Sequence, residues 1–181
     1  MQYDLNWMYR LYEQGERIKY IFFWGHQPSR NGVITKTCLS QWWEQDFVVE
    51  DILYRSAEHW MMAEKARLFE DEEHLQHILA AVSPAAAKKW GRKVRNFDQK
   101  TWEAHRFEIV KNGNLHKFSQ NEDLKQYLLQ TGERVLVEAS PYDKIWGIGK
   151  KADFPGIENP HHWDGLNLLG FALMATRDLL R

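Results

Sequence analysis

The sequence predicts an α+β fold, a mainly helical single domain around a small β-sheet. Two observations lead to this prediction. Long stretches without Gly or Pro begin with helix-capping side chains, whereas stretches rich in β-branched and aromatic residues are few and short. In addition, the 181 residues contain no repeat, low-complexity tract or Pro/Gly-rich linker that would divide the chain. We therefore expect one domain over residues 1–181.

The N-terminal part of the chain is expected to contain one helix and then a strand. Apolar side chains recur at helical spacing through residues 1–15, and Gly15 is a suitable end, so residues 1–17 are predicted to form a helical extension. Residues 18–24 are dense in β-branched and aromatic side chains and are predicted to form a strand. The stretch up to Ser40 indicates a loop. Two weaker strand candidates follow at residues 47–50 and 52–54.

The rest of the chain favours helices with recognisable starts. Ser56 can cap a helix that continues to Phe69, and Ser83 followed by Pro84 is typical of a helix start. The remaining predictions are a helix from Asp98 towards Gly113, a helix from Asn121 to about Gly132 and a final helix over residues 166–181.

Between these last two helices the sequence predicts a strand, a turn and a loop. Residues 134–139 have the Val and Leu content of a strand, and residues 140–143 have turn chemistry. Residues 144–149 are predicted to return as a second strand, in a hairpin or a tight crossover. Residues 150–165 contain two Pro and two Gly residues and indicate a long surface loop, a kind of segment that often carries function.

Charge and composition exclude several classes of protein. The net charge of −1 gives no overall attraction to nucleic acid, so an anionic ligand must be held by a local patch. The longest apolar run is far shorter than the ~20 residues that cross a bilayer, and no membrane partner is expected. A single cysteine, Cys38, excludes an intramolecular disulfide, and the N-terminus lacks a secretion signal. A cytoplasmic location is therefore expected.

The predicted helix after Ser56 carries a carboxylate and an amine on one face. Glu58 and Lys65 are seven positions apart, which places them about 10 Å apart along the helix axis. Glu58 lies in the first turn, where the helix dipole favours an ionised carboxylate. The pair can flank one small ligand, but spacing alone favours a solvated helix face.

Aromatic and basic side chains are the other candidates for ligand contacts. The chain has 9 Trp, 7 Tyr and 9 Phe residues. Trp60 and Phe69 are predicted to be core residues, whereas Trp102, Trp146 and Trp163 lie near turns or helix starts and are candidates for a ligand wall. Two basic clusters can hold phosphate oxygens or simply be solvated: Lys88, Lys89, Arg92, Lys93 and Arg95, and the pair Lys150 and Lys151.

No metal or cofactor is expected. His74 and His77 can share a helix face, and His161 and His162 are adjacent in the chain. Neither pair is completed by the cysteines or carboxylates of a recognised zinc spacing.

Taken together, several motifs in one order resemble the NADAR family, also called YbiA-like proteins, over residues 22–180. The most specific motif is the helix at residues 56–66, with its glutamate-histidine pair and its lysine. The other matching segments are residues 91–92, Trp102, 117–118, 136–149 and 163–170. This chain differs in its N-terminal extension before Ile18 and in an extended loop at residues 25–38.

The resemblance implies an α+β NADAR-like fold and N-glycosidase activity on ribosylated substrates. Two substrate classes are associated with the family: ADP-ribose attached to guanine bases, and phosphoribosyl-aminopyrimidine intermediates of riboflavin synthesis. The expected partner is therefore an ADP-ribosyl or phosphoribosyl substrate, including ADP-ribosylated bases of DNA or RNA. Removal of ADP-ribose from guanine is the first choice. The oligomeric state stays open.

The chemistry of this reaction assigns a role to each matched residue. Breaking a ribosyl C–N bond develops positive charge on the sugar, which Glu58 can stabilise, while Asp143 can hold a ribose hydroxyl or assist proton transfer. The Lys65 amine can form an imine with the ring-opened sugar. The expected substrate contacts are Trp102 and Trp146 against the base or ribose, Arg92 on phosphate, and His59, Gly147 and Asn167 from the matched motifs.

Two readings from other classes compete with this one. A catalytically silent reader of ADP-ribose or nucleotides needs an aromatic wall and a basic patch, but it does not need both Glu58 and Lys65. A structural or interaction protein would bind no nucleotide at all.

Overall fold

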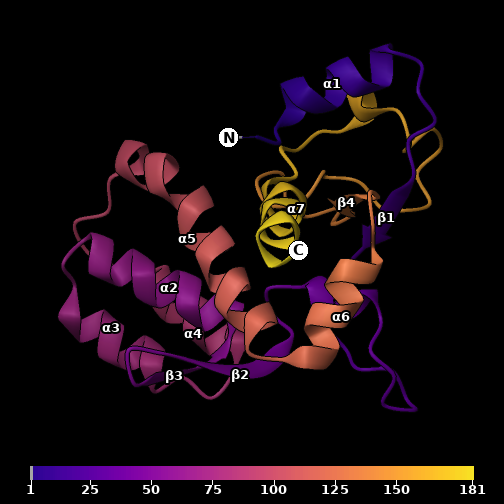
Figure 1. Cartoon of the computed structure of the whole chain (residues 1–181). Coiled ribbons are helices and arrows are strands. Elements are labelled where there is room, and N and C mark those ends of the chain that lie inside the picture. The colour runs from indigo at the N-terminus through magenta and orange to yellow at the C-terminus, as the bar shows by residue number, and fades with distance from the viewer. Residues whose placement is uncertain (1) are drawn as a thin grey trace. The chain divides into compact units, whose positions relative to one another are not determined.

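The computed structural model describes residues 2–181, and its chain divides into two compact units (Figure 1). Unit 1 contains the described residues up to Ser40 and residues 126–181, and unit 2 contains residues 41–125. Helices dominate both units, and the strands form two small two-stranded sheets. The predicted α+β class is confirmed, and the single domain over residues 1–181 stays a prediction.

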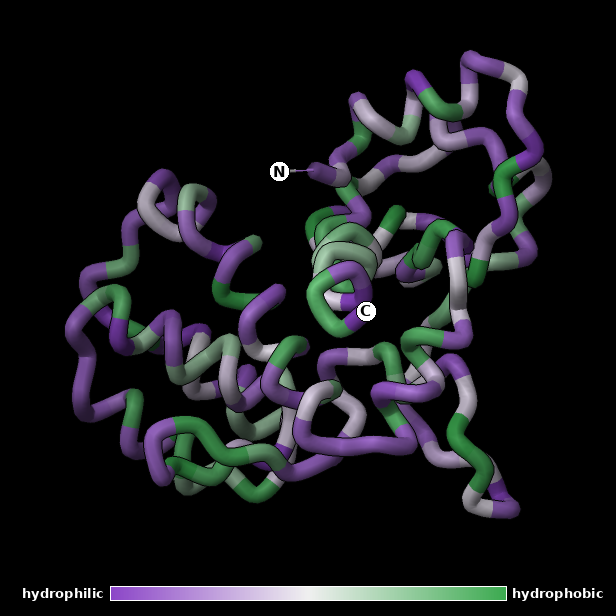
Figure 2. The backbone as a smooth tube through the Cα atoms, viewed as in Figure 1, coloured by the Kyte–Doolittle hydropathy of each residue, from purple (hydrophilic) through white to green (hydrophobic). Residues whose placement is uncertain are grey.

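Unit 1 is built on a parallel strand pair. Strand β1 (Tyr20–Phe23) pairs with β4 (Val135–Glu138), with Tyr20 opposite Val135. Helix α7 (Leu168–Leu180) packs on β4, and Figure 2 shows it green over much of its length because most of its residues are apolar. Helix α1 (Leu5–Glu13) is capped by Asp4 and contacts the short 3-10 helix η2 (Pro160–His162). A second 3-10 helix, η1 (Lys36–Leu39), lies within the expected loop before Ser40.

Unit 2 surrounds helix α2 (Ala57–Leu68) with other elements. Strands β2 (Glu44–Val49) and β3 (Ile52–Ser56) form an antiparallel hairpin that leads directly into α2. Helices α3 (Glu72–Leu79), α4 (Pro84–Gly91) and α5 (Gln99–Ser119) all contact α2. Residues 57–63 are consequently all buried, so this part of α2 has no solvated face. Helix α6 (Glu122–Gln130) follows α5.

The predicted helix caps are confirmed. Ser56 accepts a hydrogen bond from the His59 amide, Ser83 from the Ala86 amide and Asp98 from the Thr101 amide. These caps satisfy amides that have no partner within the helix. Helix α5 continues to Ser119, well beyond Gly113, which packs tightly against Trp60: a Cβ at Gly113 would lie 2.3 Å from that ring. This glycine therefore serves helix packing instead of ending the helix.

The predicted second strand at residues 144–149 is wrong, and so is the hairpin. Strand β4 pairs in parallel with β1, and residues 144–149 form turns. The carbonyl oxygens of Ile145 and Trp146 accept hydrogen bonds from the amides of Leu168 and Leu169, the first residues of α7. Because these carbonyls satisfy the N-terminal amides of α7, they are not available to a neighbouring strand.

Within residues 2–181, no helix combines the length and the apolar composition that a membrane span requires.

Candidate functional site

The N-terminus of α2 holds Glu58 in a buried polar network. The Glu58 side chain is only 1% exposed, and its backbone amide donates to the carbonyl oxygen of Gln41 at 3.0 Å. The Gln41 side chain in turn accepts a hydrogen bond of 2.8 Å from Asn114 on α5. Glu58 therefore lies at the positive end of the helix dipole in a position that is fixed from two other segments. The solvated helix face weighed from spacing alone does not describe this glutamate.

His59 has a structural place beside Glu58. Its Nε2 lies 3.1 Å from the carbonyl oxygen of Ala81, which can only accept, so Nε2 donates. Its Nδ1 then accepts from the hydroxyl of Ser56 at 2.8 Å. Burial lowers the pKa of His59, which favours this neutral form. Both ring nitrogens are bonded within the protein, so the predicted contact between His59 and the substrate has no free ring nitrogen to make it.

Lys65 is half-buried at the other end of the same helix face. Its Nζ donates to the carbonyl oxygen of Gly91 at 2.9 Å and lies 4.3 Å from the centroid of the Phe97 ring and 5.8 Å from that of Trp102. Burial lowers the pKa of Lys65 from its ordinary value of 10.5, because desolvation penalises the ammonium form. This shift moves the amine towards the neutral form that a nucleophile needs.

The unit 2 residues predicted to bind substrate differ in how accessible they are. Trp102 is 9% exposed and lies beside Lys65, so it is largely buried and not an open wall. Arg92 is exposed at the C-cap of α4, and its side chain makes no hydrogen bond or ion pair with any described residue. Arg92 is therefore available to an anion, whereas Arg95 of the same basic cluster is bound to Asp71 at 2.8 Å.

In unit 1, the predicted residues Asp143, Trp146 and Gly147 lie on one turn. One carboxylate oxygen of Asp143, Oδ1, accepts from the amides of Ile145 at 2.8 Å and Trp146 at 2.7 Å. The other oxygen, Oδ2, makes no hydrogen bond within residues 2–181. Asp143 therefore shapes the turn with one oxygen and retains the second for a ligand hydroxyl. The side chain of Trp146 is partly exposed.

Gly147 and Asn167 support this turn through the backbone. A Cβ at Gly147 would lie 2.8 Å from the carbonyl oxygen of Glu138, which leaves space for no other residue. Asn167 is fully buried in the left-handed conformation, with φ 52°, and its side chain accepts from the Glu138 amide and donates to the Leu136 carbonyl. These bonds satisfy backbone groups of β4. The side-chain amide of Asn167, which was predicted to contact substrate, is therefore already bonded within the protein.

Three other predicted candidates have structural roles. Trp163 is 7% exposed and donates through Nε1 to the Ile157 carbonyl, so it belongs to the core and not to a ligand wall. His74 bonds to the buried carboxylate of Asp71, whose pKa is lowered mainly by its hydrogen bond to Arg95. His77 stacks on the Trp90 ring with centroids 4.2 Å apart. Among the residues described, no group of His, Cys, Asp or Glu side chains has the arrangement of a metal site.

Sequence reasoning missed the residues that hold these candidates in place. Gln41 and Asn114 are buried polar side chains of unit 2, and Glu138 is a half-buried carboxylate at the end of β4. The available signal for Glu138 was its position at the carboxyl end of a parallel strand, where sites in α/β sheets occur. Gln41 precedes the predicted helix by fifteen residues, and nothing in its local pattern indicates that its backbone meets Glu58.

The chain is similar to a family model, to curated proteins and to a solved structure. The model of the NADAR domain matches residues 22–181. The chain is 44% identical over 168 residues to N-glycosidase R617 of Acanthamoeba polyphaga mimivirus, a match that covers 90% of this chain and 97% of that protein. It is 30% identical to N-glycosidase Npun_R5314 of Nostoc punctiforme, over 80% of this chain and 85% of the relative. The NMR structure of the Escherichia coli protein YbiA superposes with a TM-score of 0.70 at 25% identity, covering 91% of this chain and 86% of that one.

Proposed function

The chain belongs to the NADAR domain family, and from this premise we propose that it is a glycosidase of N-glycosyl compounds that removes ADP-ribose from ADP-ribosylated guanine bases. The family resemblance predicted from the motifs is confirmed by the match over residues 22–181. The relatives named N-glycosidase support the reaction class. The guanine-linked substrate is the finer part of the proposal and rests on the chemistry of the side chains.

The observation that carries the proposal is the pair on α2. Glu58 is buried at the N-terminal end of the helix, and Lys65 lies two turns later with its amine partly desolvated beneath aromatic rings. Cleavage of a ribosyl C–N bond develops positive charge at the sugar, which a buried carboxylate stabilises more strongly than a solvated one. A surface pair with no chemical role would not need to be held inside a ring of packed elements.

Lys65 allows a covalent route in which its amine replaces the base at C1 of the sugar. When the leaving nitrogen carries a hydrogen, the ribose ring can open to an imine between C1 and the base. The neutral Lys65 amine adds to C1, and the base departs as its amine after taking both protons that the Lys65 nitrogen loses, so one C–N bond forms as another breaks. Water then hydrolyses the Lys65 imine and returns the sugar aldehyde and the free lysine. In this route Glu58 stabilises the positive charge at C1.

Taken by itself, unit 1 carries exposed aromatic rings that suit the bases of a guanine-linked ADP-ribose. Trp24 and Tyr142 of unit 1 are 50% and 84% exposed, with ring centroids 6.0 Å apart, and Tyr142 directly precedes Asp143. Exposed rings of this kind stack on nucleobases without regard to sequence. An ADP-ribosylated guanine offers two bases, whereas a phosphoribosyl-aminopyrimidine offers one ring. The free side chain of Arg92 fits the phosphates of either substrate.

The proposal is tested by offering both substrates to one preparation. The protein is incubated with a guanine-ADP-ribosylated single-stranded oligonucleotide and, separately, with a phosphoribosyl-aminopyrimidine, and the products are identified by mass. We expect release of ADP-ribose and the unmodified oligonucleotide. Release from the aminopyrimidine alone would retain the reaction class and overturn the substrate. Tight binding of the oligonucleotide without any release would indicate a silent reader and overturn both.

A further inference from the structure

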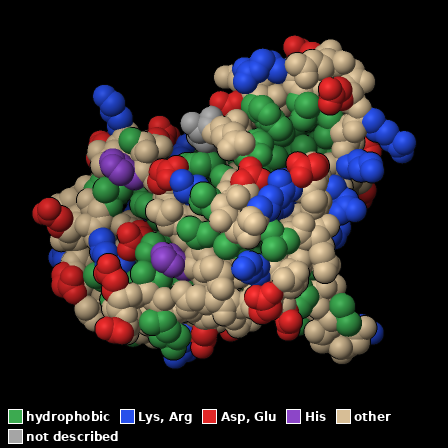
Figure 3. All heavy atoms as spheres, in the orientation of Figure 1, with side chains coloured by type: hydrophobic (Ala, Val, Ile, Leu, Met, Phe, Trp, Pro, Cys, Tyr) green, Lys and Arg blue, Asp and Glu red, His purple; other side chains and the backbone are tan. Residues whose placement is uncertain are grey.

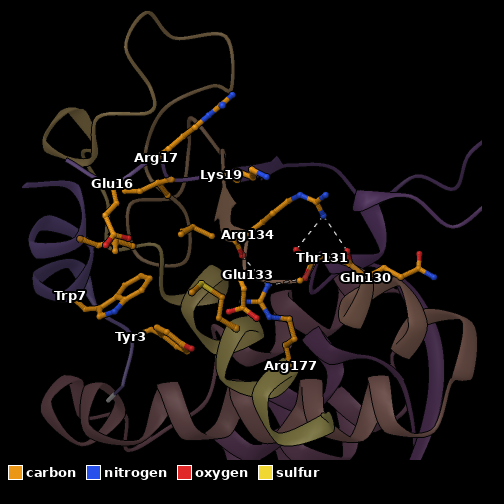
Figure 4. Close-up of a pocket in the computed structure, with 15 residues that line it drawn as sticks. Tyr3, Trp7, Glu16, Arg17, Lys19, Gln130, Thr131, Glu133, Arg134 and Arg177 are labelled. Atoms are coloured by element: carbon orange, nitrogen blue, oxygen red, sulfur yellow. Dashed lines mark hydrogen bonds between the residues drawn. The ribbon is translucent and has the colours of Figure 1, made fainter. Parts of the chain in front are cut away.

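Unit 1 contains a cavity that shares no residue with the candidate site. Its volume is about 680 Å³, within the range of small-molecule sites, and Figure 4 shows the side chains that line it. Its walls come from α1 and the segment that follows it, from the turn before β4, and from α7. In Figure 3, green apolar side chains gather beneath α1 with blue basic side chains along their border. None of Glu58, Lys65 and Asp143 lines this cavity.

A buried arginine is the central feature of the cavity. Arg177 is 1% exposed, and its Nη1 donates to the Thr131 hydroxyl and the Arg134 carbonyl, each at 2.9 Å. Its Nε is buried and has no hydrogen-bond partner among the described residues. A guanidinium has five N–H donors, and two bonds leave most of them unused. A charge buried in this way is costly unless a counter-charge accompanies it.

The protein supplies no carboxylate within ion-pair distance of Arg177 in residues 2–181. The two carboxylates that interact electrostatically with Arg177 make their close contacts with other residues. Glu133 pairs with Arg181 at 2.6 Å, and Asp178 accepts a hydrogen bond from the Tyr3 hydroxyl at 2.6 Å. Asp178 and Glu133 therefore act on the Arg177 guanidinium only from a distance, and an anion in the cavity would supply the direct counter-charge that the described chain lacks.

The rest of the lining favours the same kind of ligand. Its other cations are Arg17, Lys19 and Arg134, against the acidic Glu16 and Glu133, so the cavity carries excess positive charge. Trp7 and Tyr3 also line the cavity, and Figure 4 shows them across from Arg177 and Glu133. Trp7 is partly exposed, which leaves ring surface for a ligand.

We infer that this cavity binds a nucleoside phosphate, with its phosphate group at Arg177 and its base against Trp7. One cavity of suitable size brings together a buried guanidinium with an unbonded Nε, an excess of cations and an aromatic wall. Residues 2–21, which supply Tyr3, Trp7, Arg17 and Lys19, precede the segment that the family model matches. The site is independent of the proposed function, because neither its residues nor its chemistry include the cleavage of a C–N bond.

The position of binding can be read from the indole signal of Trp7 by NMR titration of the full chain. The probes are ADP, which has both base and phosphate, pyrophosphate, which has no base, and adenosine, which has no charge. We expect ADP to shift the Trp7 indole and the backbone amides of residues 131–135, and the other two probes to do so only at higher concentration. A Trp7→Phe variant identifies the indole signal. Failure of ADP to move either group of signals overturns the inference.

Matched charge variants test the ligand contacts without disturbing the fold. Arg17→Gln/Lys19→Gln removes two exposed cations that make no side-chain hydrogen bond in the described structure. It should weaken ADP binding about three- to fivefold. The control, Arg10→Gln/Arg30→Gln, removes two exposed cations of the same unit that do not line the cavity, and it should leave ADP affinity unchanged. Equal effects of the two double variants would reduce the result to general charge attraction and overturn the inference.

A third variant reports on the buried guanidinium. Arg177→Met keeps the length of the side chain but removes every donor, and ADP binding at Trp7 should fall by at least about tenfold. If this variant does not fold, the charge variants and the Trp7 signal still decide the question. If ADP shifts only the Trp102 indole, binding belongs to the candidate site of unit 2 and the inference is overturned. If ADP shifts Trp7 in the parent protein but the parent cleaves neither test substrate, only the proposed function is contradicted.

Discussion

Helix α2 and the turn at residues 140–149 both carry predicted site residues, but they use their side chains differently. In α2 the helix itself satisfies the backbone, so Glu58 and Lys65 project from a regular scaffold towards positions set by packing. In the turn, Asp143 Oδ1 and Gly147, together with Asn167 at the start of α7, are all needed to hold the backbone in its irregular path. Glu58 and Lys65 are therefore chemical groups on a self-supporting element, whereas His59 on the same helix and most of the turn candidates are parts of the support.

The largest expected effect comes from Lys65. Lys65→Arg should abolish turnover, because a guanidinium stays charged and cannot add to the sugar. Borohydride added during turnover should trap a covalent adduct on Lys65 in the parent and none in the variant, as detected by peptide mass. If Lys65→Arg is active, or if the parent turns over without any trapped adduct, the covalent route is wrong. Lys65 would then act only as an electrostatic anchor.

The lowered pKa of Lys65 predicts how turnover and stability should depend on pH. A step that needs the neutral amine should speed up as pH rises and level off below the ordinary lysine value of 10.5. For stability, the unfolded state binds more protons than the folded state between the folded and ordinary pKa values, so the free energy of unfolding should rise with pH in that window. Thermal melts of the parent and of Lys65→Met should show this gain in the parent only.

Glu58→Gln should lower the turnover rate by about a hundredfold or more while the melting temperature changes little, because the exchange keeps size but removes the charge that faces the developing cation. The matched control is Glu64→Gln on the same helix, where the carboxylate pairs with Arg67. Steady-state rates of the two variants decide the question. A near-parental rate in folded Glu58→Gln would mean that its burial serves the fold alone.

Trp146 and Trp102 differ in burial, so their replacement should have different effects on binding and stability. Trp146→Ala should weaken ADP-ribose binding about tenfold with a small loss of stability, as expected for a partly exposed stacking ring. Trp102 is largely buried, so Trp102→Ala should in addition cost about 3–5 kcal/mol of unfolding free energy. Calorimetric titrations and denaturant melts separate these effects, and unchanged affinity in Trp146→Ala would exclude it from the site.

The smallest effect on chemistry is expected at Asn167. Asn167→Ala removes both bonds to β4, leaves their backbone partners unsatisfied and places alanine at a φ of 52°, so unfolding free energy should fall by about 2–4 kcal/mol. Asn167→Gly loses the same bonds but tolerates the backbone angle, and it should recover about 1 kcal/mol of that loss. In the fraction that stays folded, turnover per molecule should be near parental. A loss of turnover at intact stability would move Asn167 from support to substrate contact.

The features that the sequence predicted well are those determined by neighbours in the chain. Ser56, Ser83 and Asp98 cap helices through amides three residues away, and Glu58 and Lys65 share a face because a helix has a fixed repeat. Each of these relations can be read from a short window of residues.

The features that were missed depend on distant partners. Residues 144–149 have strand-like composition, but the amides that bind their carbonyls belong to residues near 168, so local propensity gave the wrong element. The ring of His59 and the amide of Asn167 were predicted to meet substrate because both residues lie in the motifs that match the family. His59 also bonds to the nearby Ser56, but Ala81 and Leu136, which take the other hydrogen bonds, lie 22 and 31 residues away, and single-sequence patterns do not encode that distance.

The bonds between the 140–149 turn and the start of α7 also determine when the turn can fold during synthesis. The carbonyls of Ile145, Trp146 and Gly147 find their partners in the amides of Leu168, Leu169 and Asn167. A nascent chain that has reached residue 165 has already made Asp143 but lacks all three of these partners. The turn can therefore take its final shape only after α7 has been synthesised, so the segment that positions Asp143 becomes ordered later than its own synthesis.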